Sequence, residues 1–399
     1  MRRLEPTFAR GAALAILCLL PGCATIAPPP VAEESPTLLT LPLDEPYSSS
    51  THRFEIDPAA ASDMIGELRV IRASHEDTFT DIARRFNVGY EELVRANPGV
   101  DPWLPGEGRE LVLPTQHLLP NAPREGIVIN LAAMRLYYYP KPGRDEPQQV
   151  YTFPIGIGRV GWATPVGTTS VVRMARNPSW RPGRGVRAEH AANGEILPAV
   201  VPPGPDNPLG TRALYLGWPS YLIHGTNKPA GVGLRSSHGC IRMFPEDVEL
   251  LYDLVRNGTR VTVVNQPFVF GWHEGELHMQ AFDVLEDDPR DWQKAQRRLL
   301  SRGVAAKIQQ ELQARGGSID WEAVSRFSHA PRGLPVSIAR VDSTYEARIA
   351  QARRVRNALP IGATWAGETV TAESVTGETQ AAGAATAAAD VGARRESPP

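Results

Sequence analysis

Two residue types that can do covalent chemistry come close together in residues 221–243, which read YLIHGTNKPAGVGLRSSHGCIRM. His224 follows an apolar, strand-like stretch, and Cys240 comes sixteen positions later, after a glycine-rich segment. A thiol attacks a carbonyl only as its thiolate, and a free cysteine with a pKa of about 8.5 supplies little thiolate at neutral pH. An imidazole within hydrogen-bond reach can take the thiol proton and later return it to a leaving amine. The spacing therefore predicts acyl transfer through Cys240 and His224.

Gly239 precedes Cys240 directly and, because it lacks a Cβ, would let a substrate carbonyl approach the sulfur. We expect the backbone N–H groups of Gly239 and Cys240 to face the oxyanion that develops during attack. The alternative is a small buried cysteine beside two structural histidines, His224 and His238, which is the usual meaning of a single Cys and His. The Ser, Gly and Arg residues around Cys240 are not typical of a core, so the sequence favours the catalytic interpretation.

Two other motifs are weaker. Residues 156–161 read GIGRVG and match the GxGxxG pattern of dinucleotide-binding proteins, but no helix start follows them. His273 and His278 lie five positions apart with Gly275 between them, so one face of a helix would not present both to a metal. The sequence therefore predicts neither a nucleotide site nor a zinc site in these segments, and it places the two histidines in a hairpin or loop.

The start of the chain predicts export. A basic start precedes the apolar stretch 11–20, which is too short to span a bilayer. Residues 20–23 read LPGC and resemble the lipobox of bacterial lipoproteins, so Cys23 would carry lipid after removal of a signal peptide, residues 1–22. Ala24 would then permit sorting to the outer membrane, with the protein anchored by lipid in the periplasm. Ordinary signal-peptide cleavage and an uncleaved anchor are the alternatives.

The cysteine count supports a functional thiol. The chain has three cysteines; Cys18 would leave with the signal peptide and Cys23 would carry lipid, so Cys240 would have no partner. Exported proteins usually pair their cysteines, which makes an unpaired thiol notable. The formal net charge of −2 gives no indication of a nucleic-acid partner. The many Pro and Gly residues, 37 and 35, favour a turn-rich β architecture.

Changes in composition divide the chain into six parts. Residues 23–65 are rich in Pro and Ser and predict a tether. Residues 124–268 read as a mainly β domain with one helix at 245–255 and a strand at 260–264. The other parts are the signal peptide, a small unit at 66–115, an extension at 269–362 that is partly helical (292–313 and 345–359), and a disordered tail at 363–399.

Residues 66–115, called the N-terminal unit below, predict a β-α-α-β order. Apolar residues of the first helix recur at helical spacing from Phe79 to Phe86, and the pattern is interrupted at Asn87 and Gly89. The unit resembles the LysM module, which implies binding to the N-acetylglucosamine chains of peptidoglycan or chitin; a small packing domain is the alternative. The residues in matching places are Asp77, Thr78, Ile82, Ala83, Leu93, Asn97 and Leu111 to Pro114.

The segments HGT and SSHGCIRM resemble the signature of the YkuD-type L,D-transpeptidases, in the ErfK/YbiS/YcfS/YnhG branch. The resemblance extends to EGIVINLAAMRLYYYP, PIGIGRVGWATPVG, NPSWRP, PAVVPPGPDNPLG and VRNGTRVTVVNQPF, and so covers residues 124–268. It implies a β-sandwich-like catalytic domain. It also implies cleavage of the diaminopimelate–D-Ala bond of a peptidoglycan stem tetrapeptide through a cysteine thioester, without a metal or organic cofactor.

The resemblance assigns a role to each residue of the motif. It makes Cys240 the nucleophile, His224 its general base and then acid, and the carbonyl of Gly225 the group that orients the imidazole. His238 and Gly239 would shape the oxyanion pocket. The residues that would bind substrate are Arg242, Ser237 and Thr226.

The acceptor stays open in the sequence. A second diaminopimelate would give a 3-3 cross-link, and the terminal lysine of an outer-membrane lipoprotein would anchor that lipoprotein to the wall. If water took the acyl group instead, the enzyme would be an L,D-carboxypeptidase or an amidase. A wall-binding lipoprotein with an inert β domain is the non-enzymatic alternative, and the intact His224 and Cys240 argue against it.

Overall fold

The computed structural model describes residues 52–56, 62–144, 146–290, 310, 313–314, 318–340 and 342–357, and "described residues" below means these. All of them belong to one unit of the chain, Leu43–Pro399. The predicted signal peptide, Cys23 and the tail at 363–399 lie outside the described residues, as does most of the predicted helical patch at 292–313. Among the described residues, no helix has the length and apolar character needed to cross a membrane.

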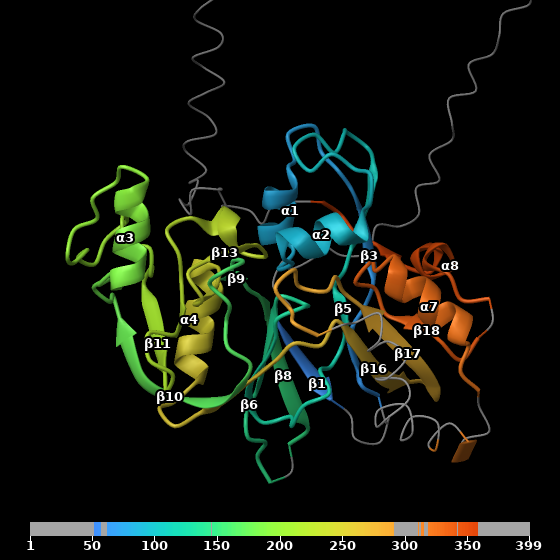
Figure 1. Cartoon of the computed structure of the whole chain (residues 1–399). Coiled ribbons are helices and arrows are strands. Elements are labelled where there is room, and N and C mark those ends of the chain that lie inside the picture. The colour runs from blue at the N-terminus through green and yellow to red at the C-terminus, as the bar shows by residue number, and fades with distance from the viewer. Residues whose placement is uncertain are drawn as a thin grey trace, which may run out of the picture. The chain divides into compact units, whose positions relative to one another are not determined.

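A nine-stranded mixed sheet forms the centre of the predicted β domain (Figure 1). The two halves of its longest strand, β10, pair with different neighbours. Gly167–Ser170 pair with β15, and the residues from Val171 onward pair with β11, with a register shift between Val171 and Arg173. In spatial order the strands are β1 (Arg53–Ile56), β8 (Gln148–Pro154), β7 (Arg135–Tyr139), β6 (Gly126–Asn130), β15 (Arg260–Val264), β10 (Gly167–Arg176), β11 (Arg212–Leu216), β12 (Leu222–His224) and β14 (Ile241–Arg242).

The main core lies between this sheet and α4 (Pro245–Leu254), which packs beside β11 (Figure 1). Pro245 occupies the first helical position, where its missing N–H costs nothing, as the sequence predicted. Val248, Leu251 and Val255 are fully buried against the sheet. Each such side chain contributes roughly 1.5–3 kcal/mol by leaving water. Because β14 leads directly into α4, this packing also fixes the chain that follows Cys240.

The N-terminal unit has the predicted element order. It consists of β3 (Arg69–Arg72), α1 (Phe79–Arg85), α2 (Tyr90–Ala96) and β4 (Glu110–Leu113), and β3 and β4 pair antiparallel. A capping box begins α1: Thr78 accepts from the Asp81 N–H, and Asp81 accepts from the Thr78 N–H.

The structure corrects the predicted tether at 23–65. Residues 53–56 form β1, which pairs antiparallel with β8 and is itself the edge strand of the sheet, and β2 (Met64–Gly66) pairs with β5 (Gln116–Leu118). The reason is apolar burial, because Ile56 joins a cluster of buried residues and Phe54 packs against it. Two apolar residues among polar neighbours gave no clear strand pattern in the sequence.

The extension shares a core with the N-terminal unit. Val70 and Val112 of that unit are buried in one cluster with Phe327 and Tyr345. A short strand of the extension, β19 (Arg353–Arg354), extends the β3–β4 sheet by pairing in parallel with β3. The other elements of the extension are β16 (Phe268–His273), β17 (Glu276–Ala281), α7 (Trp321–His329), β18 (Val336–Ser337) and α8 (Tyr345–Ala350).

A buried ion pair joins the N-terminal unit to the β domain. Arg135 of β7 donates through Nε and Nη2 to the two carboxylate oxygens of Glu92 in α2, at 2.7 and 2.6 Å. Both side chains are almost fully buried, 1% and 5% exposed. Arg135 also donates to the Asn87 carbonyl and to Thr152 Oγ1. Loss of one partner from such a pair costs about 3–5 kcal/mol, because the other charge stays buried without compensation.

Candidate active site

His224 and Cys240 line one cavity of about 1550 Å³. His224 ends β12, and Cys240 directly precedes β14, which pairs in parallel with β12 so that His224 lies opposite Arg242. The intervening loop contains a short 3₁₀ helix (Pro229–Gly231) and β13 (Arg235–Ser237). The parallel pairing therefore brings the two ends of a long loop together in one site.

The hydrogen bond of His224 fixes which ring nitrogen can act as a base. Its Nδ1 lies 2.6 Å from the carbonyl oxygen of Gly225. Because a carbonyl only accepts, Nδ1 carries the proton, and Nε2 of the neutral ring is left as the basic atom. Burial lowers the pKa of His224 to about 4, with a further lowering by the positive charge of Arg242. The imidazole is therefore neutral at physiological pH.

The thiol of Cys240 is half-buried and free. It donates to the carbonyl oxygen of Ser220 at 3.5 Å. Burial raises the pKa of Cys240, and a backbone hydrogen bond from Leu222 and the charge of Arg242 oppose this only in part. The resting state consequently pairs a neutral thiol with a neutral imidazole, not a thiolate with an imidazolium.

The sequence predicted His224 within hydrogen-bond reach of the sulfur, and here the structure differs. Among the described residues, the thiol donates its hydrogen bond to the Ser220 carbonyl, and no hydrogen bond joins Cys240 Sγ to the His224 ring. Catalytic hydrogen bonds are often long in ligand-free proteins and tighten when substrate is bound. The two groups share one cavity, so a substrate carbonyl placed there can meet both.

A serine bridges the turn that carries the nucleophile. The Ser237 hydroxyl donates to the Cys240 carbonyl at 2.6 Å and accepts from the Gly239 N–H at 3.2 Å. This differs from the prediction that the Gly239 N–H faces the oxyanion, because that N–H is already bonded. The N–H of Cys240 makes no hydrogen bond to any of the described residues, so it is the backbone donor left for an oxyanion.

Gly239 is required by its conformation. Its φ is +99°, in the region that favours glycine, and a Cβ there would lie 2.9 Å from Cε1 of Tyr221. Behind the turn, Thr164 donates to the Gly239 carbonyl at 2.9 Å and accepts from the Gly158 N–H at 3.1 Å. A Cβ on Gly158 would lie 3.0 Å from the Cα of Gly239. Gly158 of the GIGRVG segment thus lets its backbone approach that of Gly239. This segment contains a short strand, β9 (Ile157–Gly158), and is not a nucleotide-binding turn.

His238 belongs to a polar cluster on one wall of the cavity. Its Nε2 lies 3.0 Å from Nη2 of Arg159 and 3.3 Å from Oε2 of Glu189, which comes from α3 (Arg184–Ala192). Arg159 and Glu189 also form an ion pair, and the Trp162 ring meets that of His238 edge-on. Burial lowers the pKa of His238, and Arg159 adds to the lowering. His238 therefore connects the turn that carries Cys240 to α3.

The residues expected to bind substrate lie in different surroundings. Arg242 lines the cavity and donates through Nη1 to Ser236 Oγ at 3.0 Å. Ser237 lines it too, but its hydroxyl is used within the turn. Thr226 is buried, accepts from the Lys228 N–H at 2.9 Å and is not among the lining residues. The structure thus places Thr226 in the loop framework, away from the substrate space.

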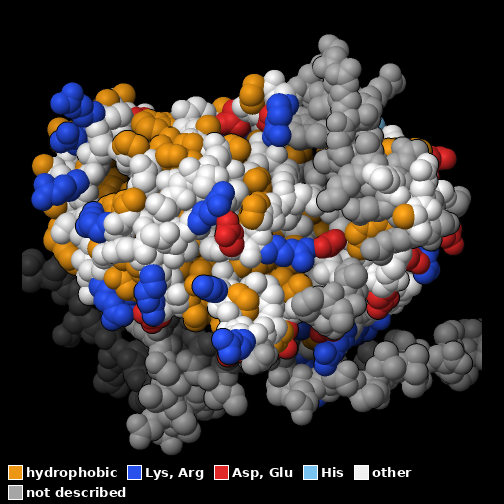
Figure 2. Space-filling model, turned by 90° about the horizontal axis from the view of Figure 1, so that it is seen from below, with side chains coloured by type: hydrophobic (Ala, Val, Ile, Leu, Met, Phe, Trp, Pro, Cys, Tyr) orange, Lys and Arg blue, Asp and Glu red, His pale blue; other side chains and the backbone are white. Residues whose placement is uncertain are grey.

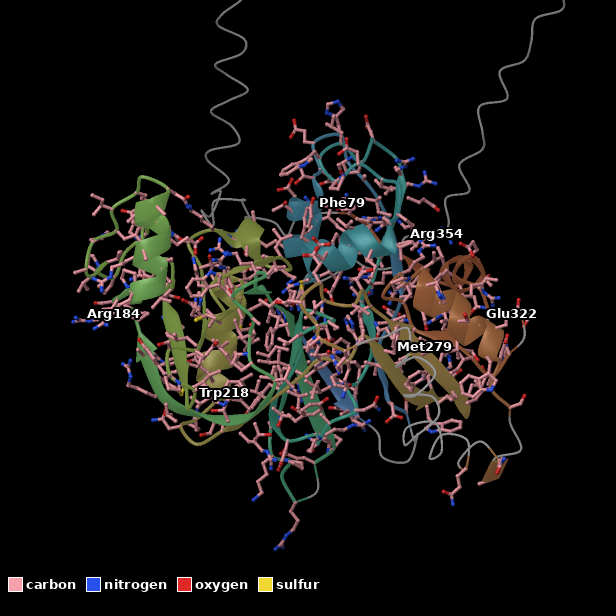
Figure 3. The ribbon with its side chains drawn as sticks, viewed as in Figure 1. Phe79, Arg184, Trp218, Met279, Glu322 and Arg354 are labelled. Carbon is pink, nitrogen blue, oxygen red and sulfur yellow. The ribbon has the colours of Figure 1, made fainter. Side chains whose placement is uncertain are left out.

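Positive charge predominates around the cavity. The ionised side chains that line it are Arg173, Arg176, Arg181, Arg184, Lys228 and Arg242 against Glu195 and Asp206. Figure 2 shows Lys and Arg side chains on the left of the lower face, the side on which β10 lies in Figure 1. Figure 3 labels Arg184 on α3 and Trp218 after β11, and both line the cavity. An acidic, extended ligand suits these walls.

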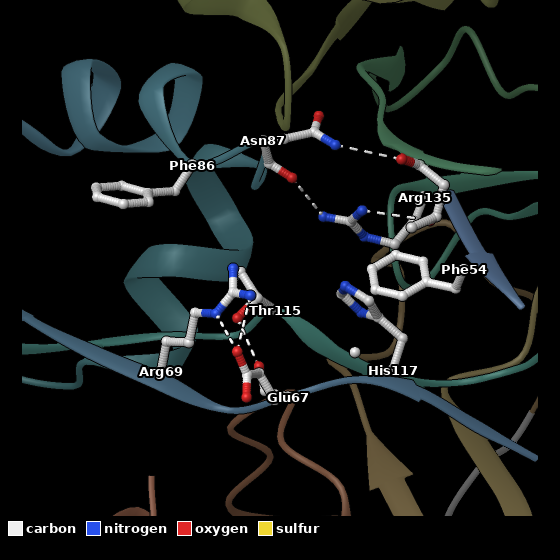
Figure 4. A pocket seen from close by; sticks show the side chains of 10 residues that line it. Phe54, Glu67, Arg69, Phe86, Asn87, Thr115, His117 and Arg135 are labelled. Carbon is white, nitrogen blue, oxygen red and sulfur yellow. Dashed lines mark hydrogen bonds and ion pairs between the residues drawn. The ribbon is translucent and has the colours of Figure 1, made fainter. Parts of the chain in front are cut away.

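A second cavity of about 290 Å³ lies away from the nucleophile, against Arg135 and His117 (Figure 4). Burial holds the pKa of His117 well below its ordinary value, and its neighbour Arg135 is paired with Glu92. Neither Cys240 nor His224 lines it.

The two histidines of the rejected metal motif lie on the hairpin β16–β17, as predicted, with His273 opposite Glu276 and His278 opposite Gly271. Glu274 and Gly275 form its turn with positive φ, 50° and 79°. Among the described residues, no group of three His, Cys, Asp or Glu side chains is placed to hold a metal ion.

Comparison with known proteins identifies the family. Residues 124–263 match the YkuD family, described as the L,D-transpeptidase catalytic domain. "Probable L,D-transpeptidase YcfS" of Escherichia coli K12 is 39% identical over 293 residues, which cover 71% of this chain and 87% of the relative. "Probable L,D-transpeptidase YbiS" of the same strain is 46% identical over 213 residues, 53% of this chain and 68% of the relative.

The chain therefore belongs to the YkuD-type L,D-transpeptidases, in the branch that contains YcfS, YbiS and ErfK. It is an enzyme with a mainly β catalytic domain. Among solved structures, a crystal structure of an Enterococcus faecium L,D-transpeptidase mutant is 19% identical with a TM-score of 0.26, over 39% of this chain and 55% of that one. The family assignment rests on the sequence relatives.

Several site residues gave no signal in the sequence. Ser220, whose carbonyl accepts the hydrogen bond of the Cys240 thiol, lies in a turn and has a positive φ of 70°. A sequence pattern does not reveal this conformation. Glu189 is far from Cys240 along the chain, and α3 has no buried residue and hence no apolar face to predict it. Trp162 follows the segment that was rejected as a nucleotide motif.

The raised pKa of Cys240 predicts how the thiol reacts with iodoacetamide. We expect slow labelling at pH 7 and a rate that increases with pH through a midpoint above 8.5, the value for a free cysteine. Mass spectrometry of the peptide that contains Cys240 measures the rate at each pH. His224→Ala is the comparison, since removal of a neutral imidazole should leave the midpoint within about one unit. A midpoint below pH 7 that His224→Ala abolishes would contradict the neutral pair.

Proposed function

We propose that this chain is a cysteine L,D-transpeptidase of peptidoglycan, with Cys240 as nucleophile and His224 as general base. One observation carries the proposal: His224 is buried and neutral, and its Nδ1 is bonded to the Gly225 carbonyl. Its ring lines the same cavity as Cys240, the only cysteine of the described residues. A histidine with Nδ1 bonded to a carbonyl can take a proton only at Nε2. The donor substrate is a stem tetrapeptide that ends in diaminopimelate and D-Ala.

In the first step, Cys240 Sγ attacks the carbonyl carbon at the L-centre of diaminopimelate while His224 Nε2 takes the thiol proton. The N–H of Cys240 faces the oxyanion, and the charge of Arg242, close enough to lower the pKa of the thiol, favours negative charge there. When the intermediate collapses, the imidazolium gives its proton to the nitrogen of D-Ala. The C–N bond breaks, D-Ala leaves as the free amino acid and a Cys240 thioester remains.

In the second step, an acceptor amine attacks the thioester carbon and gives a proton to His224 Nε2. The C–S bond breaks, the sulfur recovers the proton, and a new amide forms. The acceptor is the amine of a second diaminopimelate, which gives a 3-3 cross-link, or a lysine of a wall-anchored outer-membrane lipoprotein. His238 and Gly239 act here by holding the turn that positions Cys240, and Ser237 supports the same turn.

The charge of the cavity supports an acidic peptide as substrate. Stem peptides carry free carboxylates, and six basic side chains face two acidic ones around the cavity. Its volume, about 1550 Å³, exceeds the roughly 300–1,000 Å³ of small-ligand pockets, which suits a peptide attached to a sugar strand.

We also propose that the N-terminal unit is a LysM module that binds the glycan strand, and that Cys23 is lipidated and anchors the protein to the outer membrane, in the periplasm. Two large apolar side chains on the unit, Trp103 and Leu104, are 66% and 75% exposed, which supports a binding surface there. A tethered enzyme with a glycan-binding unit would meet its wall substrate at a high effective concentration.

Product analysis tests the proposed reaction. The protein is incubated with a disaccharide-tetrapeptide, and mass spectrometry identifies the products. We expect dimers that have lost one D-Ala, and we expect Cys240→Ala and His224→Ala to form none, because one removes the nucleophile and the other the base. Tripeptide monomer alone would instead show a hydrolase. An active Cys240→Ala protein would contradict the proposal.

Charge reversal on α3 tests the acidic substrate. Arg184 lines the cavity and no acidic side chain of the described residues pairs with it, so Arg184→Glu should raise KM for the tetrapeptide about fivefold, with kcat within twofold. High salt should shrink the difference, because exposed charges are screened. Arg187→Glu is the matched control, since Arg187 is exposed on the same helix but does not line the cavity. Equal effects of both reversals would exclude a local role for Arg184.

A further inference from the structure

We propose that the N-terminal unit is a positioning element for the nucleophile, and that Gly233 is the residue through which it acts. This inference rests on the proposed function, because it concerns the same Cys240 and His224. Gly233 lies in the loop that connects the two residues, and this loop packs against the start of α2. The unit would then do more than bind glycan: it would hold the catalytic loop in its active conformation.

The contact between Gly233 and α2 is backbone against backbone. The Gly233 carbonyl accepts from the N–H of Glu91 at 3.1 Å, so the loop satisfies one of the free N–H groups at the start of the helix. A Cβ on Gly233 would lie 2.2 Å from the N of Tyr90 and 2.5 Å from the Cα of Gly89. The φ of Gly233 is +79°, so both its conformation and its surroundings require glycine.

The start of α2 is itself held by the catalytic sheet. The carboxylate of Glu92 accepts from the Gly89 N–H at 2.6 Å and binds Arg135 of β7 with both oxygens. Arg135 also donates to the carbonyl of Asn87, which lies in the short connection between α1 and α2, as Figure 4 shows. The ion pair therefore sets the place of the surface on which the loop rests.

The loop carries this placement on to the nucleophile. Directly after Gly233, the Leu234 carbonyl accepts from the Ile157 N–H at 3.1 Å, and β13 pairs with β9. β13 ends at Ser237, whose hydroxyl bonds the carbonyl of Cys240. Hydrogen bonds and the short chain segments between them thus connect Arg135 to the turn that holds the sulfur. A displacement of about 1 Å in such a geometry can cost roughly 100-fold in rate.

Alanine at position 233 tests the inference in the full chain. Gly233→Ala places a Cβ into the backbone of α2, and we expect kcat for D-Ala release to fall roughly 10- to 100-fold with KM within about twofold. The matched control is Gly258→Ala, because Gly258 also has a positive φ, +89°, but a Cβ there would have no atom within 4 Å. It should lose similar stability from backbone strain and keep kcat within about twofold. Both variants are compared below their melting temperatures.

A second variant, Gly89→Ala, tests the inference if Gly233→Ala does not fold. Gly89 has an ordinary φ of −81°, and a Cβ there would lie 3.1 Å from the Cα of Gly233, a contact that a small shift relieves. Gly89→Ala should therefore fold and lower kcat about threefold. The inference is overturned if Gly233→Ala has the same kcat as Gly258→Ala. If Gly233→Ala does not fold, the same comparison is made with Gly89→Ala.

Iodoacetamide labelling separates this inference from the proposed function, because it needs no wall substrate. If the wild-type protein releases no D-Ala, the proposed function fails and the labelling rate of Cys240 at pH 8.5 decides. We expect this rate to change at least threefold in Gly233→Ala relative to Gly258→Ala. The positioning role would be overturned if Gly233→Ala and Gly258→Ala are labelled at equal rates and either both keep their kcat or neither turns over substrate.

Discussion

The burial of one histidine determines the protonation of the proposed catalytic pair, His224 and Cys240. Because His224 is almost fully buried and gives its Nδ1 proton to the Gly225 carbonyl, its ring stays neutral, with one basic nitrogen, Nε2. Burial also keeps Cys240 protonated, since it raises the pKa of the thiol. The proposed mechanism then requires proton transfer in the transition state, when a substrate carbonyl is present for the sulfur to attack. A thiol that is neutral at rest is also less prone to oxidation, because oxidation follows thiolate character.

The surroundings of this pair are built from three parts of the chain that are joined by a buried ion pair and by shared apolar clusters. The sheet and α4 supply β12 and β14, the N-terminal unit supports the loop between them, and the extension packs on the other side of that unit. Asp283 of the extension binds Arg95 of α2 at 2.6 Å, so α2 is held from the catalytic sheet and from the extension together. This arrangement gives the extension a structural role that its sequence did not indicate.

Local patterns predicted the local elements well. The helix 245–255, the strand 260–264, the hairpin at His273 and His278, and the order of elements in the N-terminal unit follow from apolar spacing, capping residues and turns, and all appear in the structure. Long-range contacts were not predictable in this way. Strand β1 forms by pairing with β8, and the neutral state of the Cys240–His224 pair depends on burial. Neither of these has a signature within a short window of sequence.

The protonation of His224 tests the account most directly. NMR of ¹⁵N-labelled histidine rings, with the His224 signals assigned by comparison with His224→Gln, reports which nitrogen carries the proton at each pH. We expect a neutral ring protonated at Nδ1 from about pH 5 to pH 8, which becomes an imidazolium only near pH 4. A ring protonated on both nitrogens at pH 7, which loses a proton when Cys240 is replaced by alanine, would show a thiolate–imidazolium pair and contradict it.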